Sequence, residues 1–142
     1  MRRAMAARLK ADGYTLASFI SRESRVDAEC IGEGTIVLPG CVIQPFVHLG
    51  DGNLFEAGVT ICHHTQVGDY NFFAPSVAVA GQVQIGDECF LGNNCTVKNG
   101  VQIGDRVLVG AGAYVAHDVD AGKVIVPERS VELERSSKDM KI

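Results

Sequence analysis

Two adjacent histidines, His63 and His64, are the residues of this sequence best suited to proton transfer. The ordinary pKa of histidine lies near neutral pH, so an imidazole can remove the proton from an attacking hydroxyl or amine. Gly81 follows His63 by eighteen residues, and a backbone N–H at such a glycine can hold a developing oxyanion. The competing interpretation is that the histidines are solvated surface residues and that Gly81 only forms a turn.

The spacing of these residues has meaning because a six-residue repeat begins at Ile31 and continues without insertion for fifteen hexads. The first position of every hexad is apolar: Ile31, Val37, Ile43, Leu49, Phe55, Ile61, Val67, Phe73, Val79, Ile85, Leu91, Val97, Ile103, Val109 and Val115. The fifth position is Thr, Cys, Val or Ala except at Asn53 and Asn71. An α-helix has a period of 3.6 residues and cannot keep this phase. The repeat predicts an all-β parallel β-helix, in which Val79 and Ile85 point inward.

A second period of eighteen residues indicates the shape of each coil. The glycines that mark it are Gly32, Gly50, Gly68, Gly86 and Gly104. Glycine and the Asp that follows most of them favour corners, because both tolerate left-handed backbone conformations. Three hexads then form one triangular coil, and five full coils, about 24 Å in total height, run from Ile31 to Asp120. His63 lies outside the core near a corner, and Gly81 lies about 5 Å away on the next coil.

The pattern divides the chain into three segments. Residues 1–24 are expected to form a helix from Arg3 and a strand within 14–20, as a cap or the remnant of a front domain. Residues 25–121 form the hexapeptide-repeat β-helix, and residues 122–142 form a C-terminal strand and a mobile tail. A solenoid needs such caps because each coil bonds only to its neighbours.

Charge and cysteine content exclude several classes of protein. Residues 1–25 carry six basic and two acidic side chains, whereas residues 26–121 carry eleven acidic side chains and only Lys98 and Arg106 as bases. An acidic body without a basic stripe argues against nucleic-acid binding. The sequence has no apolar run long enough to span a membrane or form a signal peptide. Five cysteines without a C-x-x-C spacing favour reduced thiols and a cytoplasmic location.

The hexads resemble those of the bacterial hexapeptide-repeat acyltransferases, and this resemblance implies a left-handed parallel β-helix. Within that group, Ile61-Cys-His-His-Thr-Gln-Val-Gly-Asp followed by Ala78-Val-Ala-Gly81 is similar to the sugar and sialic acid O- and N-acetyltransferases. The resemblance covers about Gly13 to Val126. It implies transfer of an acyl group, expected to be acetyl, from acyl-CoA to a hydroxyl or amine of a sugar or nucleotide sugar for surface glycan biosynthesis. It also implies a homotrimer that needs no metal.

The resemblance assigns His63 as the catalytic base. His64 stands where family members often carry an acid, and a second family histidine would fall at Phe72. Glu56 is a possible orienting residue for His63. Family members usually begin with a nucleotide-sugar-binding α/β domain, of which only a helix and a strand like its end are expected here. These differences concern the acceptor sugar and the group that orients the base.

Acetyl-CoA is the expected co-substrate, and Gly81, Lys98, Asn99 and Arg106 are the candidates for binding it. The N–H of Gly81 would face the thioester carbonyl oxygen. Lys98 and Arg106 could attract the phosphates of coenzyme A, although ordinary solubilising charge explains them equally well. Asn99 lies two coils from His63 and could line the path of the pantetheine arm.

Two other functions are compatible with the sequence. A β-helix of this kind can be a non-catalytic assembly scaffold, which would bind no CoA. The γ-class carbonic anhydrases share the fold and bind zinc through three histidines, two of them spaced H-x-x-x-x-H. This spacing is missing from the sequence, which makes a zinc enzyme the weaker alternative. His48 and His117 are interpreted as structural or solvated residues.

Overall fold

A computed structural model describes residues 2–128 of the chain, which form one short helix followed by a stack of two-residue strands. The helix is α1 (Arg2–Ala11). The strands are β1 (Phe19–Ile20), β2 (Arg25–Val26), β3 (Cys30–Ile31), β4 (Ile36–Val37), β5 (Val42–Ile43), β6 (His48–Leu49), β7 (Leu54–Phe55), β8 (Thr60–Ile61), β9 (Gln66–Val67), β10 (Phe72–Phe73), β11 (Ala78–Val79), β12 (Gln84–Ile85), β13 (Phe90–Leu91), β14 (Thr96–Val97), β15 (Gln102–Ile103), β16 (Leu108–Val109), β17 (Tyr114–Val115) and β18 (Val124–Ile125).

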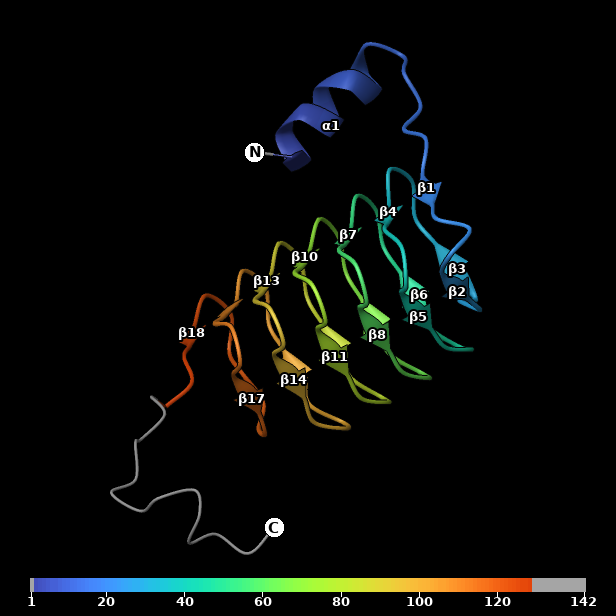
Figure 1. The fold of residues 1–142 in the computed structure, drawn as a ribbon. Coiled ribbons are helices and arrows are strands. Elements are labelled where there is room, and N and C mark those ends of the chain that lie inside the picture. The colour runs from blue at the N-terminus through green and yellow to red at the C-terminus, as the bar shows by residue number, and fades with distance from the viewer. Residues whose placement is uncertain (1, 129–142) are drawn as a thin grey trace, which may run out of the picture.

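These strands form three parallel sheets, one on each side of a triangular coil (Figure 1). Sheet A contains β1, β4, β7, β10, β13, β16 and β18. Sheet B contains β2, β5, β8, β11, β14 and β17, and sheet C contains β3, β6, β9, β12 and β15. Within the repeat, neighbouring strands pair eighteen residues apart, as in Phe72 with Leu54 and with Phe90. The three edges of the prism are named here the AB corner (for example 57–58), the BC corner (63–64) and the CA corner (69–70).

The interior follows the hexad pattern and confirms the predicted parallel β-helix. Val79 is 1% and Ile85 is 4% exposed, so both point inward as expected. The two exceptional fifth positions are also buried, because the amide of Asn53 donates to the carbonyls of Gly50 and Gly68. Asn53 in turn accepts a hydrogen bond from the backbone N–H of Asn71. These asparagines therefore satisfy backbone groups of adjacent coils inside an otherwise apolar core.

The β-helix is longer than the sequence predicted, with about six turns instead of five. Its first turn begins at β1, where Phe19 pairs with Ile36, and the expected strand within 14–20 is confined to these two residues. The inward residues of that turn are Ile20, Val26 and Ile31. Their spacings are six and then five residues, so one residue is missing from the hexad phase and the turn cannot be recognised by its period. At the other end β18 pairs with β16, while the expected tail after residue 128 lies outside the described residues.

Helix α1 packs along the CA corner and explains the opposite charges of the two segments (Figure 1). Arg3 forms an ion pair with Asp87 at 2.7 Å, and Lys10 forms one with Asp51 at 3.0 Å. Arg2 donates to the carbonyls of Gly52 and Tyr70 at 2.9 and 2.7 Å. The basic helix therefore binds a column of acidic corners. No helix within residues 2–128 is long and apolar enough to cross a membrane.

Candidate active site at the BC corner

The BC corner is a column of polar and small residues that runs along the prism. Each coil contributes two corner residues, and those of adjacent coils lie one above the other. The pairs are Pro45–Phe46, His63–His64, Gly81–Gln82, Asn99–Gly100 and His117–Asp118. The second residue of a pair takes a left-handed conformation in most of them, with φ of +59° at His64 and +74° at Gly100. The hexad period therefore determines which residue of each coil projects its side chain from the BC corner.

The His63 imidazole lies directly against Gly81, so the predicted pair meets across one coil. A β-carbon added to Gly81 would lie 2.6 Å from Cε1 and 2.9 Å from Nε2 of His63. Such contacts are closer than van der Waals packing allows. Glycine is thus the residue that leaves room for the imidazole at this level. His63 itself is exposed, whereas Gly81 is buried beneath it.

His64 fixes the orientation of His63. The Nδ1 atoms of the two rings are 3.0 Å apart, so one must donate a proton to the other. If Nδ1–H of His63 is the donor, its Nε2 carries the lone pair on the side facing Gly81. His64 is in turn held by Phe46, whose ring centroid lies 4.8 Å from that of His64. The rings of His64 and Phe46 therefore support the position of the His63 ring.

The peptide of Gly81 is held by its carbonyl group, while its N–H has no acceptor within residues 2–128. The backbone N–H of Gly100 donates to the Gly81 carbonyl at 3.1 Å, and the Asn99 side-chain amide donates to the same oxygen. The N–H of His63 has a partner, because Oε1 of Gln44 accepts it at 2.9 Å. Gly81 thus presents an uncommitted amide donor beside an exposed imidazole, which is the arrangement an oxyanion site requires.

The remaining predicted site residues lie at different distances from this pair. Asn99 is two coils from His63 in the same column, and exposed Lys98 directly precedes it. Glu56 follows β7 in sheet A, and within residues 2–128 it makes no hydrogen bond or ion pair with His63. Arg106 lies at the CA corner, beside Asp87, to whose carbonyl its N–H donates at 2.7 Å. One chain therefore brings together His63, His64, Gly81 and Asn99, but not Glu56 or Arg106.

Two residues of the site were not recognised from the sequence. Gln44 and Phe46 lie one coil before His63 and His64, and they hold the His63 amide and the His64 ring. The eighteen-residue period places them below the two histidines, so spacing alone could have identified them. Their residue types carry no chemical signal, which is why they were not selected. His48, by contrast, lies on sheet C and contacts Glu29 at 3.2 Å.

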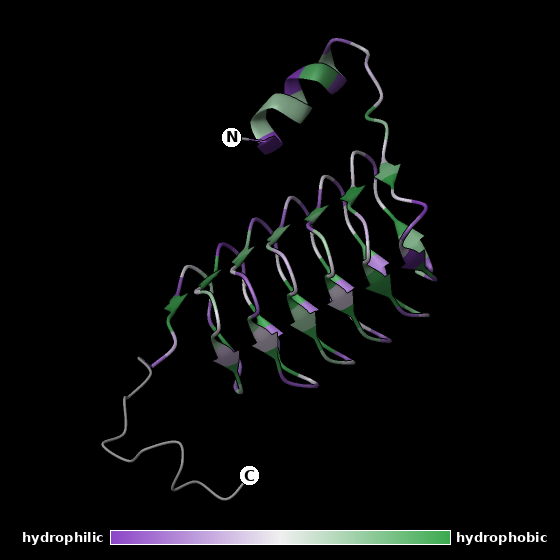
Figure 2. Cartoon of the chain, in the orientation of Figure 1, coloured by the Kyte–Doolittle hydropathy of each residue, from purple (hydrophilic) through white to green (hydrophobic). Residues whose placement is uncertain are grey.

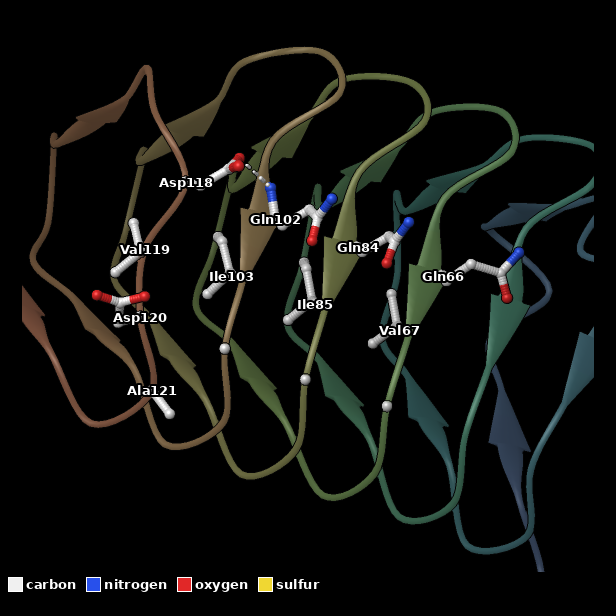
Figure 3. A pocket seen from close by; sticks show the side chains of 13 residues that line it. Gln66, Val67, Gln84, Ile85, Gln102, Ile103, Asp118, Val119, Asp120 and Ala121 are labelled. Atoms are coloured by element: carbon white, nitrogen blue, oxygen red, sulfur yellow. Dashed lines mark hydrogen bonds between the residues drawn. The ribbon is translucent and has the colours of Figure 1, made fainter.

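Sheet C forms an open groove next to the BC corner. Its volume is about 660 Å³, and Gln66, Gln84 and Gln102 line it as a row of outward side chains (Figure 3). Asp118, at the end of the row, accepts a hydrogen bond from the Gln102 backbone at 2.8 Å. The outward strand residues of β6, β9, β12 and β15 are a histidine and three glutamines, while Val67, Ile85 and Ile103 line the groove between them.

The thiols that lie inside the prism are unsuited to chemistry. Burial raises the pKa of Cys95 to about 11, and burial also raises the pKa of Cys41 and of Cys89. A raised pKa keeps these thiols protonated and unreactive near neutral pH. Within residues 2–128 no three His, Cys, Asp or Glu side chains converge as metal ligands.

Two family models match parts of the repeat. Residues 31–63 match the model of the bacterial transferase hexapeptide (six repeats), and residues 82–116 match the hexapeptide repeat of succinyl-transferase. A comparison with curated protein sequences gives no significant match.

Several solved structures are similar to this chain. The acetyltransferase domain of PglB from Neisseria gonorrhoeae FA1090 is 26% identical with a TM-score of 0.86, over 89% of this chain and 62% of that one. PerB from Caulobacter crescentus, in complex with CoA and GDP-perosamine, is 27% identical with a TM-score of 0.84, over 88% and 61%. WeeI from Acinetobacter baumannii AYE is 26% identical with a TM-score of 0.85, over 89% and 62%. This chain therefore spans less than two thirds of the length of these structures.

Proposed function

We propose that this chain, which carries the hexapeptide repeat of bacterial transferases, transfers an acetyl group from acetyl-CoA to a hydroxyl or amine of a nucleotide sugar. The observation that carries the proposal is the exposed His63 imidazole held by His64 against the free amide of Gly81. Solved structures show the similar PglB domain in complex with acetyl coenzyme A, and PerB in complex with CoA and GDP-perosamine. A role in the synthesis of surface glycans follows from that substrate class.

The proposed reaction uses His63 first as a base and then as an acid. Nε2 of His63 takes the proton of the sugar hydroxyl or amine as its oxygen or nitrogen attacks the thioester carbon. The carbonyl oxygen becomes an oxyanion, to which the Gly81 N–H donates. The C–S bond then breaks, the carbonyl re-forms, and the CoA sulfur leaves as a thiol with the proton returned from His63. Atoms and charge balance without a metal.

His64 stabilises the imidazolium that forms during the reaction. Its Nδ1, 3.0 Å from Nδ1 of His63, accepts the Nδ1–H of His63 both before and after proton transfer. In this role it replaces the acidic orienting group, because Glu56 is not in contact with His63 within one chain. Glu56 is retained as a candidate only through a second copy of the chain.

The CoA molecule is proposed to follow the BC corner. Asn99 and Lys98 lie along the column beyond Gly81 and would contact the pantetheine arm and a phosphate. Arg106 lies at another corner and could contribute to the same CoA only from a neighbouring copy. We therefore propose a homotrimer with CoA in the groove between copies. The reduced cysteines of residues 2–128 agree with a cytoplasmic location.

The decisive experiment incubates the purified chain with acetyl-CoA and a panel of nucleotide amino sugars. Release of free thiol is followed, and the product mass shows whether an acetyl group has been added. Periodate- and base-sensitivity of the product then distinguish O- from N-acetylation. Binding of CoA with acetylation of one sugar class supports the proposal. A chain that neither binds CoA nor releases thiol with any acceptor would instead be the non-catalytic scaffold.

A further inference from the structure

The first turn of the prism departs from the six-residue repeat, and this departure puts an acidic side chain on the outer face of sheet C. The residue before each regular strand of sheet C is buried: Val47, Thr65, Val83 and Val101. In the first turn, Val26 and Ile31 are only five residues apart. The backbone N–H groups of Glu29 and Cys30 both donate to the Val47 carbonyl there, at 2.9 and 3.4 Å. Glu29 therefore precedes its strand as those buried residues do, but it is exposed.

Glu29 and Cys30 both lie next to His48, the outward residue of β6 on the adjacent coil. Oε2 of Glu29 is 3.2 Å from Nε2 of His48, and the two side chains are 57% and 46% exposed. Cys30 pairs with His48 in the register of β3 and β6. Paired residues of neighbouring parallel strands lie about 4.8 Å apart, with their side chains on the same face. A thiol, an imidazole and a carboxylate therefore gather on the outside of the prism.

The contact with Glu29 determines which nitrogen of His48 is available as a base. A carboxylate accepts hydrogen bonds, so Nε2 of His48 carries the proton that it donates to Glu29. The lone pair then lies on Nδ1, which makes no hydrogen bond within residues 2–128. Glu29 is also the only charged side chain that pairs with His48 among these residues. A nucleophile, a base and a group that orients the base form the arrangement by which proteins activate a weak nucleophile.

The Cys30 thiol lies on a polar face that is open to solvent. Cys30 is exposed, whereas Cys41, Cys89 and Cys95 are buried. Figure 2 shows sheet A as a row of hydrophobic strands, whereas the outward neighbours of Cys30 along sheet C are His48 and then a row of glutamines. A dissolved reagent therefore reaches this thiol without any opening of the fold.

We propose that Cys30 is a site of thiol–disulfide exchange, with His48 as its base and Glu29 as the residue that orients the base. The reagent is a small disulfide, and the product is a mixed disulfide on the outer face of sheet C. His63 and Gly81 take no part in this reaction. The site is therefore independent of the proposed acyl transfer.

The exchange balances with the disulfide as the only co-reactant. Nδ1 of His48 takes the proton of the Cys30 thiol, and the thiolate attacks one sulfur of the disulfide. The S–S bond of the reagent breaks as the new S–S bond to Cys30 forms. The other half of the reagent leaves as a thiolate and takes the proton back from His48. The Cys30 sulfur is oxidised, and the departing sulfur is reduced to a thiol.

The backbone around Cys30 favours a disulfide over a thioester as the reagent. Attack on a thioester creates an oxyanion, which needs an uncommitted hydrogen-bond donor. The N–H of Cys30 donates to the Val47 carbonyl at 3.4 Å, and the N–H of His48 donates to the Thr65 carbonyl at 3.0 Å. The N–H of Gly81, by contrast, has no acceptor within residues 2–128. Disulfide exchange forms no oxyanion on carbon and has no such requirement.

The site is tested with glutathione disulfide as the probe and the mass of the intact chain as the readout. Cys62→Ser is the background, because it leaves Cys30 as the only thiol outside the core. This chain should gain one glutathionyl group at pH 7 while it is folded. The further change Cys30→Ser should abolish the gain. A Cys62→Ser chain that forms no adduct would overturn the proposal.

The role of the base is tested by the rate of the same reaction. An unaided thiol is only a few per cent thiolate near pH 7, so a base raises the rate by roughly thirtyfold at most. In the same background, His48→Gln should lower the rate about tenfold, and Glu29→Gln should lower it less. Gln84→Ala, on the same face, is the matched control and should keep the native rate. Near pH 10 all these chains should react alike, because thiols ionise there without a base.

Two outcomes contradict the assignment of the base. One is a native rate at pH 7 in either His48→Gln or Glu29→Gln. The other is a loss of rate that persists near pH 10, since it would show that the substitution only obstructs the thiol. Glu29→Gln changes an exposed side chain, so the test remains decisive if His48→Gln fails to fold.

Acetyl-CoA provides the last comparison, because it is a thioester. The Cys62→Ser chain incubated with acetyl-CoA should gain no acetyl group on Cys30. An acetyl group there that hydroxylamine removes would show that the reagent is a thioester and would refute the choice of a disulfide. None of these measurements needs an acceptor sugar, whereas the proposed acyl transfer is measured only with one. Failure of the thiol site is therefore distinguished from failure of the proposed function.

Discussion

The CA and BC corners have the same backbone pattern, but they differ in whether the N–H of the first corner residue has a side-chain acceptor. At the CA corner the first corner N–H of three successive coils donates to an Asp carboxylate of the next coil: Asp51 to Asp69 at 2.8 Å, Asp69 to Asp87 at 2.8 Å and Asp87 to Asp105 at 2.9 Å. At the BC corner His63 uses Gln44 for this purpose, and Gly81 uses no group within residues 2–128. One corner is closed by its own side chains, whereas the other is left available to a ligand.

The CA corner contributes to stability, whereas the BC corner is the proposed site of the chemistry, although the backbone is nearly the same at both. A carboxylate that accepts a backbone N–H forms a strong, charge-assisted hydrogen bond, and the same carboxylates hold helix α1 through Arg3 and Lys10. The Gly81 N–H has no acceptor within residues 2–128 although Gly81 is buried beneath the His63 ring, and a buried donor without a partner is uncommon in a folded protein. The repeat therefore supplies an equivalent donor wherever the first corner residue is not proline, and the side chains of adjacent coils decide which of these donors already has a partner.

The largest effect is expected from the core, on which both corners depend. Ile85→Asp would bury a charge without a partner, at a cost of several kcal/mol, so insoluble or unfolded protein is expected. Ile85 is 4% exposed, whereas the adjacent Gln84 points outward, so Gln84→Asp is the matched control and should fold. The same holds for Val79→Asp. Circular dichroism and solubility measure the result, and a well-folded Ile85→Asp chain would contradict the inward register.

The next largest effect concerns the BC corner and its base. His63→Ala should lower the initial rate at saturating acyl-CoA by about 10² to 10⁴, the usual contribution of a positioned base. CoA affinity should change little, and His64→Ala should cause a smaller loss because it only orients His63. His48→Ala and His117→Ala are the controls, since neither has a glycine amide against its ring. Native activity in His63→Ala would disprove the assignment.

A pair of glycine substitutions tests the two parts of the comparison directly. An added β-carbon at Gly81 meets the His63 ring, which can move, so Gly81→Ala should keep its melting temperature and lose activity. At Gly86 the added atom meets the Asp105 carboxylate and also the backbone of Asp105 and Gly104, which cannot move freely. Gly86→Ala should therefore lower the melting temperature, unlike Gly81→Ala. Thermal melts and rates of both variants provide the test, and equal losses of stability would remove the distinction.

The smallest effect concerns the pH dependence of the CA corner. Burial alone would raise the pKa of Asp87, but the hydrogen bond from the Asp69 amide and the Arg3 guanidinium outweigh it and hold the pKa below its usual value of 3.8. A carboxylate with a lowered folded pKa stabilises the fold above that usual value and loses this contribution as pH falls through the folded pKa.

Asp87→Asn should therefore flatten the acid limb of the stability curve. Its side-chain oxygen can still accept the Asp69 amide, but the ion pair with Arg3 is lost. Melting temperatures between pH 7 and pH 2 measure the change, and Arg3→Gln should reproduce part of it, because the Asp69 amide still donates to Asp87. A native-like acid limb in both variants would show that the ion pair contributes nothing, as is common for exposed pairs.

Most of the fold could be predicted from the sequence because the hexad period directly encodes which side chains point inward. The prediction did not include the first turn, because Val26 and Ile31 are five residues apart there and the six-residue period is broken. It also could not show that Asn53 and Asn71 are buried, since their partners are carbonyls of adjacent coils. A period determines register, but it carries no information on hydrogen-bond partners.

The arrangement of the candidate residues was predicted in part for the same reason. The eighteen-residue spacing correctly stacked Gly81 on His63, because that contact is a property of the register. The bond between His63 and His64, and the support from Gln44 and Phe46, depend on side-chain rotamers that spacing does not determine. The sequence likewise showed that the N-terminal segment is basic and the repeat acidic, but it did not show that helix α1 packs on the CA corner.

The strict stacking of coils also restricts how this chain can change in length. Removing or adding six residues preserves the alternation of core positions, so the interior would still pack. Every residue after the change would, however, rotate by one third of a turn about the prism axis. If the change lay between His63 and Gly81, Gly81 would lie over another corner and Asn99 would leave the column of His63. The interior is therefore compatible with insertions or deletions of six residues, whereas the alignment of His63 with Gly81 is kept only when the length changes by a whole coil of eighteen residues.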